Sequence, residues 1–234
     1  MIATVVIPVL DEALSLPLVL AELPRDLVRR VIVVDNGSTD GSAAVARAHG
    51  AHVVTEPRRG YGSACLAGVA ALRVDDEIVA FLDGDHSDYP DDLRELLEPV
   101  WSGAADLVIG SRMLRHEARR ALPPQARFGN RLAALLMRLL FGLRCTDLGP
   151  FRVIRQADLH RLGMTDRDFG WTVEMQLRAH LRGLRVREVP VRYRARIGDS
   201  KISGTLRGSL RAGYKILKTI FVYRLRLGRI AAGG

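Results

Sequence analysis

The sequence predicts an α/β protein built around a mostly parallel β-sheet, and three observations support this fold class. Short apolar runs alternate with helical patterns through the first 110 residues. Most of these runs are nearly continuous in apolar residues rather than apolar at every second position, which is typical of strands buried on both faces. Strands that alternate with helices at this spacing imply right-handed crossovers, so we expect a doubly wound arrangement.

The expected elements follow from the same patterns, in chain order. Strands are expected at residues 3–9, 31–34, 51–55 and 78–82. Helices are expected at residues 14–23, 42–49 and 61–72, and Pro90 opens a further helix with Asp91 and Asp92 in its first turn. Later in the chain we expect two helical patterns within 113–155, a strand at 187–193 and a basic amphipathic helix at 206–230.

The net charge of +9 conceals an asymmetry between the two halves of the chain. Residues 1–109 hold 8 Lys and Arg against 18 Asp and Glu, whereas residues 110–234 hold 27 against 8. The acidic half suits a cation, and the basic half suits phosphates or an anionic membrane surface, although generic surface arginine explains part of the excess. Nucleic acid is disfavoured as a partner, because no helix-turn-helix, zinc-finger or RNA-binding sheet signature is present.

Size and composition favour one cytoplasmic domain. A chain of 234 residues can bury a sizeable core, and we assign residues 1–217 to one domain with halves at 1–110 and 111–217. The N-terminus lacks the basic region of a signal peptide, and lysines interrupt the longest late apolar stretch. Cys65 and Cys145 suggest neither a disulfide framework nor a zinc site, which fits a reducing compartment.

The acidic loop Asp83-Gly84-Asp85 is the strongest candidate for chemistry. It directly follows the apolar run 78–82, and the carboxyl ends of parallel strands are where open α/β sheets bind ligands. Two carboxylates separated by one small residue supply the hard oxygen ligands that suit Mg²⁺ or Mn²⁺. We therefore expect a metal site at Asp83 and Asp85, with an ordinary solvated acidic turn as the alternative.

Two further loops in the same half have polar residues at ligand positions. Asp35 follows the strand at 31–34, where a carboxylate can accept hydrogen bonds from a base or a ribose. Arg58 and Gly60 precede a helix N-terminus, which is a position suited to anions. Asp40 is open between a ligand role and a helix cap. The first 110 residues therefore look like a nucleotide-binding half.

Seven short motifs stand in a fixed order along the chain. They are VVIPVLDE from Val5, VVDNGSTDGS from Val33, RRGYGSA from Arg58, FLDGD from Phe81, IGSR from Ile109, TDLGPFRVIR from Thr146 and EVPVRYRARIGDSK from Glu188. Their order and spacing resemble glycosyltransferase family 2, from residue 3 to about 217, and within it the polyprenyl-phosphate sugar synthases of the dolichol-phosphate mannose synthase type. The resemblance implies a GT-A fold with a Rossmann-like mixed sheet, a nucleotide-diphosphate-sugar donor, a divalent metal and inversion at the anomeric carbon.

The resemblance also implies roles for individual residues. Those for the donor are Pro8, Glu12 and Asp35 around the nucleoside, Asp83 and Asp85 at the ribose, diphosphate and metal, and Arg112 at a phosphate. Two departures from the family pattern stand out. Asn36 occupies a position where many relatives have a second Asp, and Leu148-Gly149-Pro150 replaces the more usual Thr-Ser-Gly on the acceptor side.

The basic half supplies candidates for the acceptor. Residues 128–141 follow Pro123-Pro124 and are strongly amphipathic, which fits either a core-facing helix or one that meets membrane or a lipid tail. In membrane-anchored relatives, arginines of this region meet the acceptor phosphate. Arg127 and Arg131, one turn apart, are the candidates in this chain.

Asp147 and Glu174 are the carboxylates of the basic half that match family motifs. A phosphate acceptor is already an oxyanion near neutral pH, because its second pKa is about 6, and it needs no strong base. A hydroxyl acceptor would need a carboxylate to take its proton. We predict Asp147 as the catalytic group and Glu174 in a positioning role, with a salt bridge from Glu174 to Arg178 as the structural alternative.

The segment after the last expected strand can close over the donor. By alternation, Arg192, Arg194 and Arg196 lie on one strand face, so the whole set need not reach the site. We predict that Arg196, Ser200 and Lys201 stabilise the charge of the leaving diphosphate. The helix at 206–230 would lie on a membrane, dock on the sheet or contact a second copy in a homodimer.

The predicted function is that of a cytoplasmic, metal-dependent, inverting transferase at the inner membrane surface. It would move a hexose from UDP- or GDP-hexose to a polyprenyl phosphate, with a soluble phosphorylated metabolite or a glycan hydroxyl as the alternative acceptor. A sugar nucleotidyltransferase would want a glycine-rich loop after the first strand, and residues 7–12 contain no glycine. A non-enzymatic basic binding protein would show no affinity for metal or nucleotide sugar.

Overall fold

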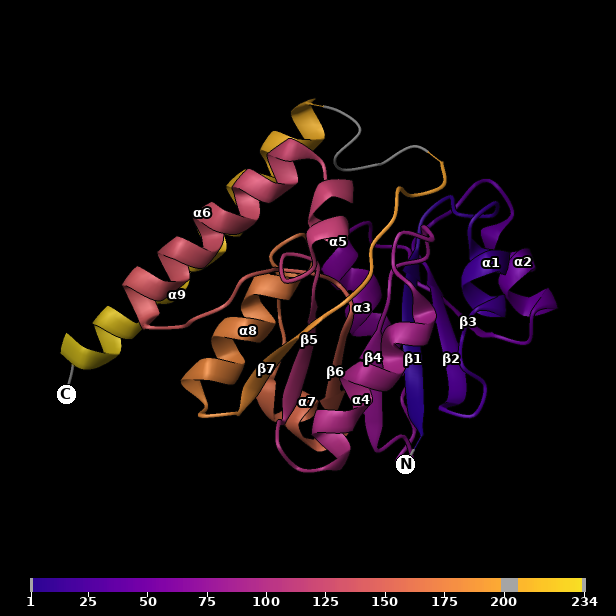
Figure 1. The fold of residues 1–234 in the computed structure, drawn as a ribbon, viewed down its shortest axis with the longest axis horizontal. Helices are drawn as coiled ribbons and strands as arrows, with labels where there is room; N and C mark the ends of the chain where they lie inside the picture. Colours follow the sequence, from indigo (N-terminus) through magenta and orange to yellow (C-terminus); the bar gives the residue numbers. More distant parts are fainter. Residues whose placement is uncertain (1, 199–205, 233–234) are drawn as a thin grey trace.

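Seven strands form one mixed sheet in this computed structural model, which describes residues 2–198 and 206–232. The strands are β1 (Ala3–Val9), β2 (Val28–Asp35), β3 (His52–Thr55), β4 (Ile78–Phe81), β5 (Leu107–Ser111), β6 (Arg152–Arg155) and β7 (Val186–Pro190). They lie in the order β3-β2-β1-β4-β6-β5-β7, and only β6 runs antiparallel to its neighbours (Figure 1). The predicted mixed, mostly parallel α/β sheet is confirmed.

Helices cover both faces of the sheet. They are α1 (Leu16–Ala21), α2 (Ser42–Ala48), α3 (Tyr61–Ala70), α4 (Leu93–Trp101) with a 3₁₀ turn before it (Pro90–Asp92), α5 (His116–Ala121), α6 (Pro124–Phe141), α7 (Gln156–Leu162), α8 (Trp171–Leu181) and α9 (Leu206–Ala232). Side chains alternate along β1, so Val5 and Ile7 pack under α1, α2 and α4, while Val6 packs under α3, α7 and α8.

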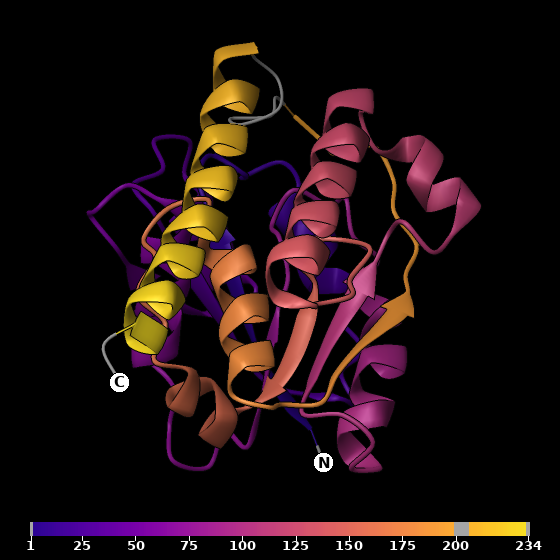
Figure 2. The same cartoon turned by 90° about the vertical axis from the view of Figure 1, so that its left-hand side faces the viewer.

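The two long helices α6 and α9 form an outer layer. They pack on each other, and α9 also packs on α8. Met137, Val173, Leu177 and Ile220 are buried in the small core between these three helices. Figure 2 shows α6 and α9 in front of the sheet, on the side that bears α8. Within the described residues, no helix is long and apolar enough to cross a bilayer.

Three local expectations differ from the structure. The helix expected at 14–23 is shorter, because Pro17 fits only its first turn and Leu14 stays exposed. The end of the range 113–155 forms strand β6 instead of helix, with Val153 and Ile154 buried between β4 and β5. The last strand ends at Pro190, which is consistent with proline having no N–H for a sheet ladder.

Candidate active site

A cavity of about 310 Å³ opens at the carboxyl ends of β1 and β4. These strands are parallel neighbours, so the loops that follow them meet at one edge of the sheet. The lining residues are Pro8, Val9, Leu10, Glu12, Asn36, Arg59, Gly60, Tyr61, Ala64, Asp83, Gly84, Asp85, Asp168, Phe169, Arg196 and Arg211. The predicted site residues gathered here are therefore Pro8, Glu12, Gly60, Asp83, Asp85 and Arg196.

The acidic loop after β4 lies close against β1 because Gly84 has no side chain. A Cβ on Gly84 would lie 3.0 Å from Cγ2 of Val9 and 3.4 Å from Cγ2 of Ile7. Soon after it, His86 has a positive φ of 62°, which turns the chain sharply. The tight turn holds the two carboxylates on either side of Gly84 at the mouth of the cavity.

Asp83 and Asp85 both line the cavity but have different partners. Tyr61 donates its hydroxyl to Oδ1 of Asp83 at 3.2 Å. Ser87 donates its backbone N–H and its hydroxyl to Oδ1 of Asp85, at 2.9 and 2.6 Å. Burial, together with the charge of Asp85, raises the pKa of Asp83 to about 7. A cation bound between the two carboxylates would relieve their repulsion, so the pair suits Mg²⁺ or Mn²⁺.

Two carboxylates are few ligands for a metal site that the protein forms alone. Among the described residues, no group of three or more His, Cys, Asp or Glu side chains could hold a metal ion. Mg²⁺ is commonly held by one or two carboxylates together with substrate phosphates and water. The donor set of Asp83 and Asp85 therefore fits a metal that arrives with, or is completed by, a diphosphate.

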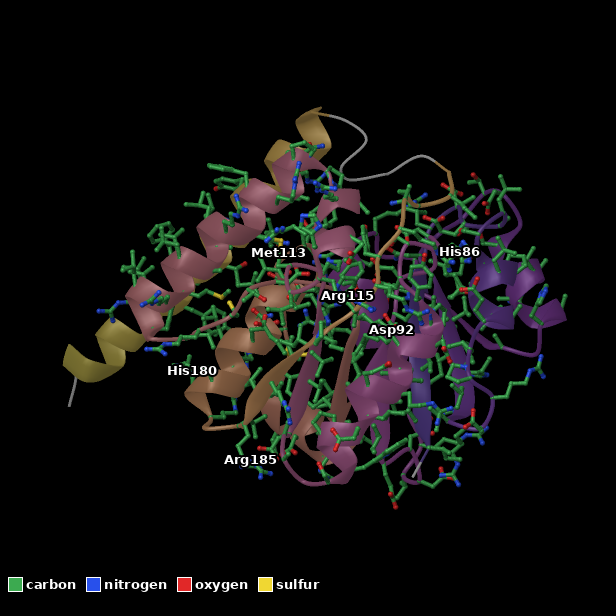
Figure 3. All side chains as sticks on the ribbon, in the orientation of Figure 1. His86, Asp92, Met113, Arg115, His180 and Arg185 are labelled. Carbon is green, nitrogen blue, oxygen red and sulfur yellow. The ribbon has the colours of Figure 1, made fainter. Side chains whose placement is uncertain are left out.

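Residues 191–198, which we call the strap, run from β7 to the cavity. Arg192 donates Nε to Oδ1 of Asp92 at 2.6 Å, and Arg194 donates Nε to the carbonyl of His86 at 2.7 Å. Asp92 and His86 both lie along the course of the strap (Figure 3). These contacts fix the first part of the strap, and of its three arginines only Arg196 lines the cavity.

Arg196 lies between two carboxylates of the cavity. Its Nη1 is 3.2 Å from Oδ2 of Asp85, and its Nη2 donates to Oε1 of Glu12 at 2.5 Å. Ser15 donates its hydroxyl to the other oxygen of Glu12 at 2.8 Å. The strap thus places a positive charge next to a predicted metal ligand.

Asp35 is the last residue of β2 and Asn36 follows it, but only Asn36 lines the cavity. The Asp35 carboxylate accepts the backbone N–H of Ser38 at 2.9 Å and closes the turn there. It is buried and ends its strand as predicted, although the nucleoside role assigned to it stays a prediction.

The Asn36 side chain holds the loop that precedes α3. Its Nδ2 donates to the carbonyls of Glu56 and Arg58, both at 2.8 Å, and its Oδ1 accepts the N–H of Gly60 at 2.8 Å. Only an amide can donate and accept in this way, so an Asp here could not make all three bonds. Gly60 has a φ of +142°, and a Cβ on it would lie 2.1 Å from the carbonyl oxygen of Arg167. The departure at position 36 thus has a structural reason.

Asp147 and Arg112 form a buried bidentate pair. Arg112 donates Nε to Oδ2 at 2.7 Å and Nη2 to Oδ1 at 2.8 Å, and its backbone N–H donates to Oδ2 at 2.9 Å. Asn130 and the backbone of Leu148 also donate to Oδ1, at 2.6 and 2.7 Å. Burial alone would raise the pKa of Asp147, but the charge and hydrogen bonds of Arg112 outweigh it and hold this pKa below its usual value.

The catalytic role predicted for Asp147 and the phosphate contact predicted for Arg112 stay predictions, and the structure shows the two side chains paired with each other. Both oxygens of the carboxylate are occupied, and neither side chain lines the cavity. The guanidinium of Arg112 also lies over the ring of Tyr193, 5.1 Å from its centroid. The pair joins the segment after β5 to the segment before β6.

Glu174 joins three parts of the structure. Its carboxylate accepts the backbone N–H groups of Thr165 and Asp166, at 3.0 and 2.6 Å, and the hydroxyl of Tyr223 on α9 at 2.8 Å. Arg178, four residues on, donates Nε to it at 3.0 Å, so the structural alternative is the observed one. Glu174 does not line the active-site cavity, and its predicted positioning role would act through the segment 165–166.

The other predicted residues lie elsewhere. Arg58 lines a second depression, whereas its neighbour Arg59 lines the active-site cavity. Arg127 is half-buried and Arg131 is exposed on α6, and neither has an ion pair with another described residue. Ser200 and Lys201 lie outside the described residues.

Sequence reasoning missed four residues near the site. Tyr61 holds Asp83, and Arg152 is fully buried and donates to the carbonyls of Thr172 and Gly149. Asp88 is 2% exposed, and neither of its carboxylate oxygens has a hydrogen-bond partner among the described residues. Phe169 lines the cavity from the second half. Tyr61 and Arg152 fall inside the motifs quoted above, so the motifs pointed to them.

Comparisons with known proteins show what this chain is similar to. Residues 4–163 match the family model described as glycosyl transferase family 2. An uncharacterized glycosyltransferase of Mycobacterium tuberculosis is 45% identical over 218 residues, which cover 93% of this chain and 97% of that protein. The undecaprenyl-phosphate mannosyltransferase of Micrococcus luteus is 33% identical over 217 residues, covering 87% and 88%.

Solved structures share the fold. Glucosyl-3-phosphoglycerate synthase of Mycobacterium tuberculosis, in complex with Mn²⁺, UDP and glucosyl-3-phosphoglycerate, has a TM-score of 0.73 at 23% identity, covering 95% of this chain and 79% of that one. Mannosyl-3-phosphoglycerate synthase of Rubrobacter xylanophilus has a TM-score of 0.76 at 18% identity, covering 98% and 75%. With its GT-A fold and its matching sequence, the chain belongs to glycosyltransferase family 2.

Proposed function

We propose that this protein is a metal-dependent, inverting hexosyltransferase that uses a nucleotide-diphosphate sugar and transfers to a polyprenyl phosphate at the inner membrane surface. The observation that carries the proposal is the Asp83–Asp85 pair at the mouth of the cavity, with a cationic side chain beside it. A relative at 33% identity is named for transfer to undecaprenyl phosphate, which supports the acceptor class.

The donor would lie along the cavity from its apolar end to the acidic loop. The nucleoside would contact Pro8, Glu12 and Gly60, and the diphosphate would lie beside Asp83 and Asp85. A divalent ion bound by these carboxylates would neutralise the diphosphate and stabilise it as a leaving group. Arg196 would take the same diphosphate as its partner once the ion has taken its place at Asp85.

A phosphate acceptor fits the charges of the site. One of its oxygens would attack the anomeric carbon from the face opposite the diphosphate, and the nucleoside diphosphate would leave with the electrons of the broken C–O bond. No proton has to be removed, because the acceptor is already an oxyanion at neutral pH. The engagement of Asp147 with Arg112, and of Glu174 with Thr165 and Asp166, is compatible with a reaction that uses no base.

The outer helices would provide the membrane contact. Large apolar side chains are exposed on both of them: Phe128, Leu135 and Leu139 on α6, and Tyr214, Phe221 and Leu225 on α9. Arginines and lysines lie on the same helices, and this combination is typical of helices that rest on an anionic bilayer. Arg127 and Arg131 at the start of α6 would then meet the acceptor phosphate.

A soluble phosphorylated acceptor is the second candidate. The solved structures that share the fold are synthases of glucosyl- and mannosyl-3-phosphoglycerate, whose acceptor side also takes a phosphate ester. The chemistry at the donor would be the same, but an acceptor that reacts through a hydroxyl, rather than through its phosphate, would also need a carboxylate to take its proton.

One experiment separates these acceptors. The protein would be incubated with UDP- and GDP-hexoses, with or without Mn²⁺, and with either a short-chain polyprenyl phosphate or 3-phosphoglycerate. We expect metal-dependent transfer of sugar into the lipid fraction. Transfer to phosphoglycerate alone would favour the second candidate. Failure to bind any nucleotide sugar in the presence of metal would contradict both.

A further inference from the structure

A second depression, of about 350 Å³, lies beside the active-site cavity. The segment 165–169 separates the two, because Asp168 and Phe169 line the active-site cavity while Asp166 and Arg167 line the second depression. Helix α9 contributes to both, with Arg211 in the first and Lys215 in the second. The same segment and the same helix therefore border both depressions, but different polar residues line each of them.

Cationic side chains dominate the second depression, which we call the basic basin. Four of them line it, namely Arg58, Arg167, Lys215 and Lys218. The acidic residues in its lining are Asp166 and Glu174. The balance of four positive and two negative charges leaves an excess of two positive charges in one small depression.

The acidic groups of the basic basin neutralise only one of its four cations, Lys215. Glu174 is buried and engaged by Thr165, Arg178 and Tyr223, as described above. Asp166 is 3.5 Å from Nζ of Lys215 and accepts the N–H of Asp168 at 2.8 Å.

The remaining three cations of the basin have no carboxylate partner among the described residues. Arg58, Arg167 and Lys218 come from three separate segments of the chain, and none of them forms an ion pair with another described residue. Elsewhere in the structure, arginines that converge on one place find carboxylates, as Arg192 and Arg194 do along the strap. Like charges held close together raise the free energy of the protein unless an anion joins them.

We propose that the basic basin binds a phosphate group. A phosphate dianion would match the excess of two positive charges, and arginines can donate paired N–H groups to its oxygens. The source is either a soluble phosphate or the headgroup of an anionic lipid, because Lys218 lies on the same helix as the exposed Tyr214 and Phe221. The proposal needs neither a donor nor a metal, so it stands or falls independently of the proposed function.

The test compares two double variants of the full chain. Arg167→Ala/Lys218→Ala removes two exposed cations of the basin, and Arg47→Ala/Arg182→Ala removes two exposed cations that line neither depression. Binding of inorganic phosphate is measured by isothermal titration calorimetry without metal or nucleotide. Sedimentation with vesicles of phosphatidylglycerol, or of phosphatidylcholine alone, measures binding to lipid.

The expected result is saturable binding that the basin variant weakens about tenfold and the control variant leaves near the wild-type value. Loss confined to inorganic phosphate assigns a soluble ligand, and loss confined to phosphatidylglycerol vesicles assigns a lipid headgroup. The proposal is overturned if wild-type protein binds neither probe, or if both variants lose affinity equally, since the second result would reflect net charge alone. Melting temperatures of both variants confirm that they are folded.

Discussion

Two acidic sites of this chain, Asp83 with Asp85 in the first half and Asp147 in the second, use their charges in opposite ways. In the first half, Asp83 and Asp85 face a cavity at the end of a buried strand. In the second half, Arg112 and Asp147 face each other and are closed off from the cavity. A charge that stays open to solvent and ligands can do chemistry, whereas a charge that is fully paired in the interior fixes the position of other groups.

The largest effect is expected from a substitution in the Asp83–Asp85 pair, which is open to the cavity. Asp85→Ala should lower kcat about 10²- to 10³-fold, because it removes a metal ligand that acts on the charge developing at the diphosphate. Asp91→Ala is the matched control, since Asp91 is exposed in the following turn and does not line the cavity. Turnover would be measured by sugar transfer, with melting temperature as the check of folding. Full activity in Asp85→Ala would remove Asp85 from the mechanism.

A substitution in the Arg112–Asp147 pair, which we call the closed pair, should lower the stability of the protein more than its turnover. Asp147→Ala leaves Arg112 buried without its partner, and such a loss costs about 3–5 kcal/mol. Asp106→Ala, which removes the half-buried carboxylate partner of the exposed Arg185, is the control and should cost far less. Urea unfolding followed by circular dichroism measures both variants. If both lose stability equally, the contrast between open and closed charges is wrong.

The closed pair also predicts a direction for acid unfolding. The folded pKa of Asp147 is lowered, so its contribution to stability is fully present above the unfolded value of about 3.9. That contribution is lost as the pH falls through the lower folded value. Wild-type protein should therefore lose stability below about pH 4 more steeply than Asp147→Asn, which has no carboxylate to protonate there. Unfolding curves measured from pH 6 to pH 3 would test this.

A smaller effect is expected where the two halves touch. Gly60→Ala would place a Cβ 2.1 Å from the carbonyl oxygen of Arg167. The loop that precedes α3 and the segment 165–168 would therefore have to move apart. Gly41 also has a positive φ, but nothing lies within 4 Å of a Cβ built on it. Gly41→Ala is therefore the control, because it strains the backbone at a positive φ as Gly60→Ala does but causes no steric clash. We expect donor affinity to fall about tenfold in Gly60→Ala and less in Gly41→Ala, as measured by titration with UDP or GDP.

How far the sequence could predict this protein also differs between the halves. In the first half, Asp83 follows the buried strand β4, and topology alone brings the ends of β1 and β4 together. The fold class and the placement of Asp83 and Asp85 beside the end of β1 follow from that rule, whereas Glu12 is predicted from the family motifs. The sequence could not separate Arg58 from Arg59, because the direction of each depends on the turn between them and Gly60.

The second half depends on contacts between residues far apart in the chain. Asp147 follows an apolar stretch as Asp83 does, but Arg112 lies 35 positions away and occupies both of its oxygens. Strand β6 is four residues long and antiparallel, so no alternation with helices marks it. Periodicity describes local structure, and it cannot tell which charges are already paired.

The strap joins the two halves, and its residue Arg196 tests the contrast between open and paired charges. Its guanidinium lies 3.2 Å from Asp85, and a metal would have to compete with it for this carboxylate. Arg196→Gln should therefore bind Mn²⁺ about tenfold more tightly than wild type in the absence of donor, as followed by electron paramagnetic resonance. The same variant should turn over more slowly, because the diphosphate loses a cation. Arg194→Gln is the control, since its partners are Glu22 and His86 at the edge of the strap. If Arg196→Gln binds Mn²⁺ no more tightly than wild type, Arg196 does not compete with the metal for Asp85. Its contact with Asp85 then only holds the strap in place.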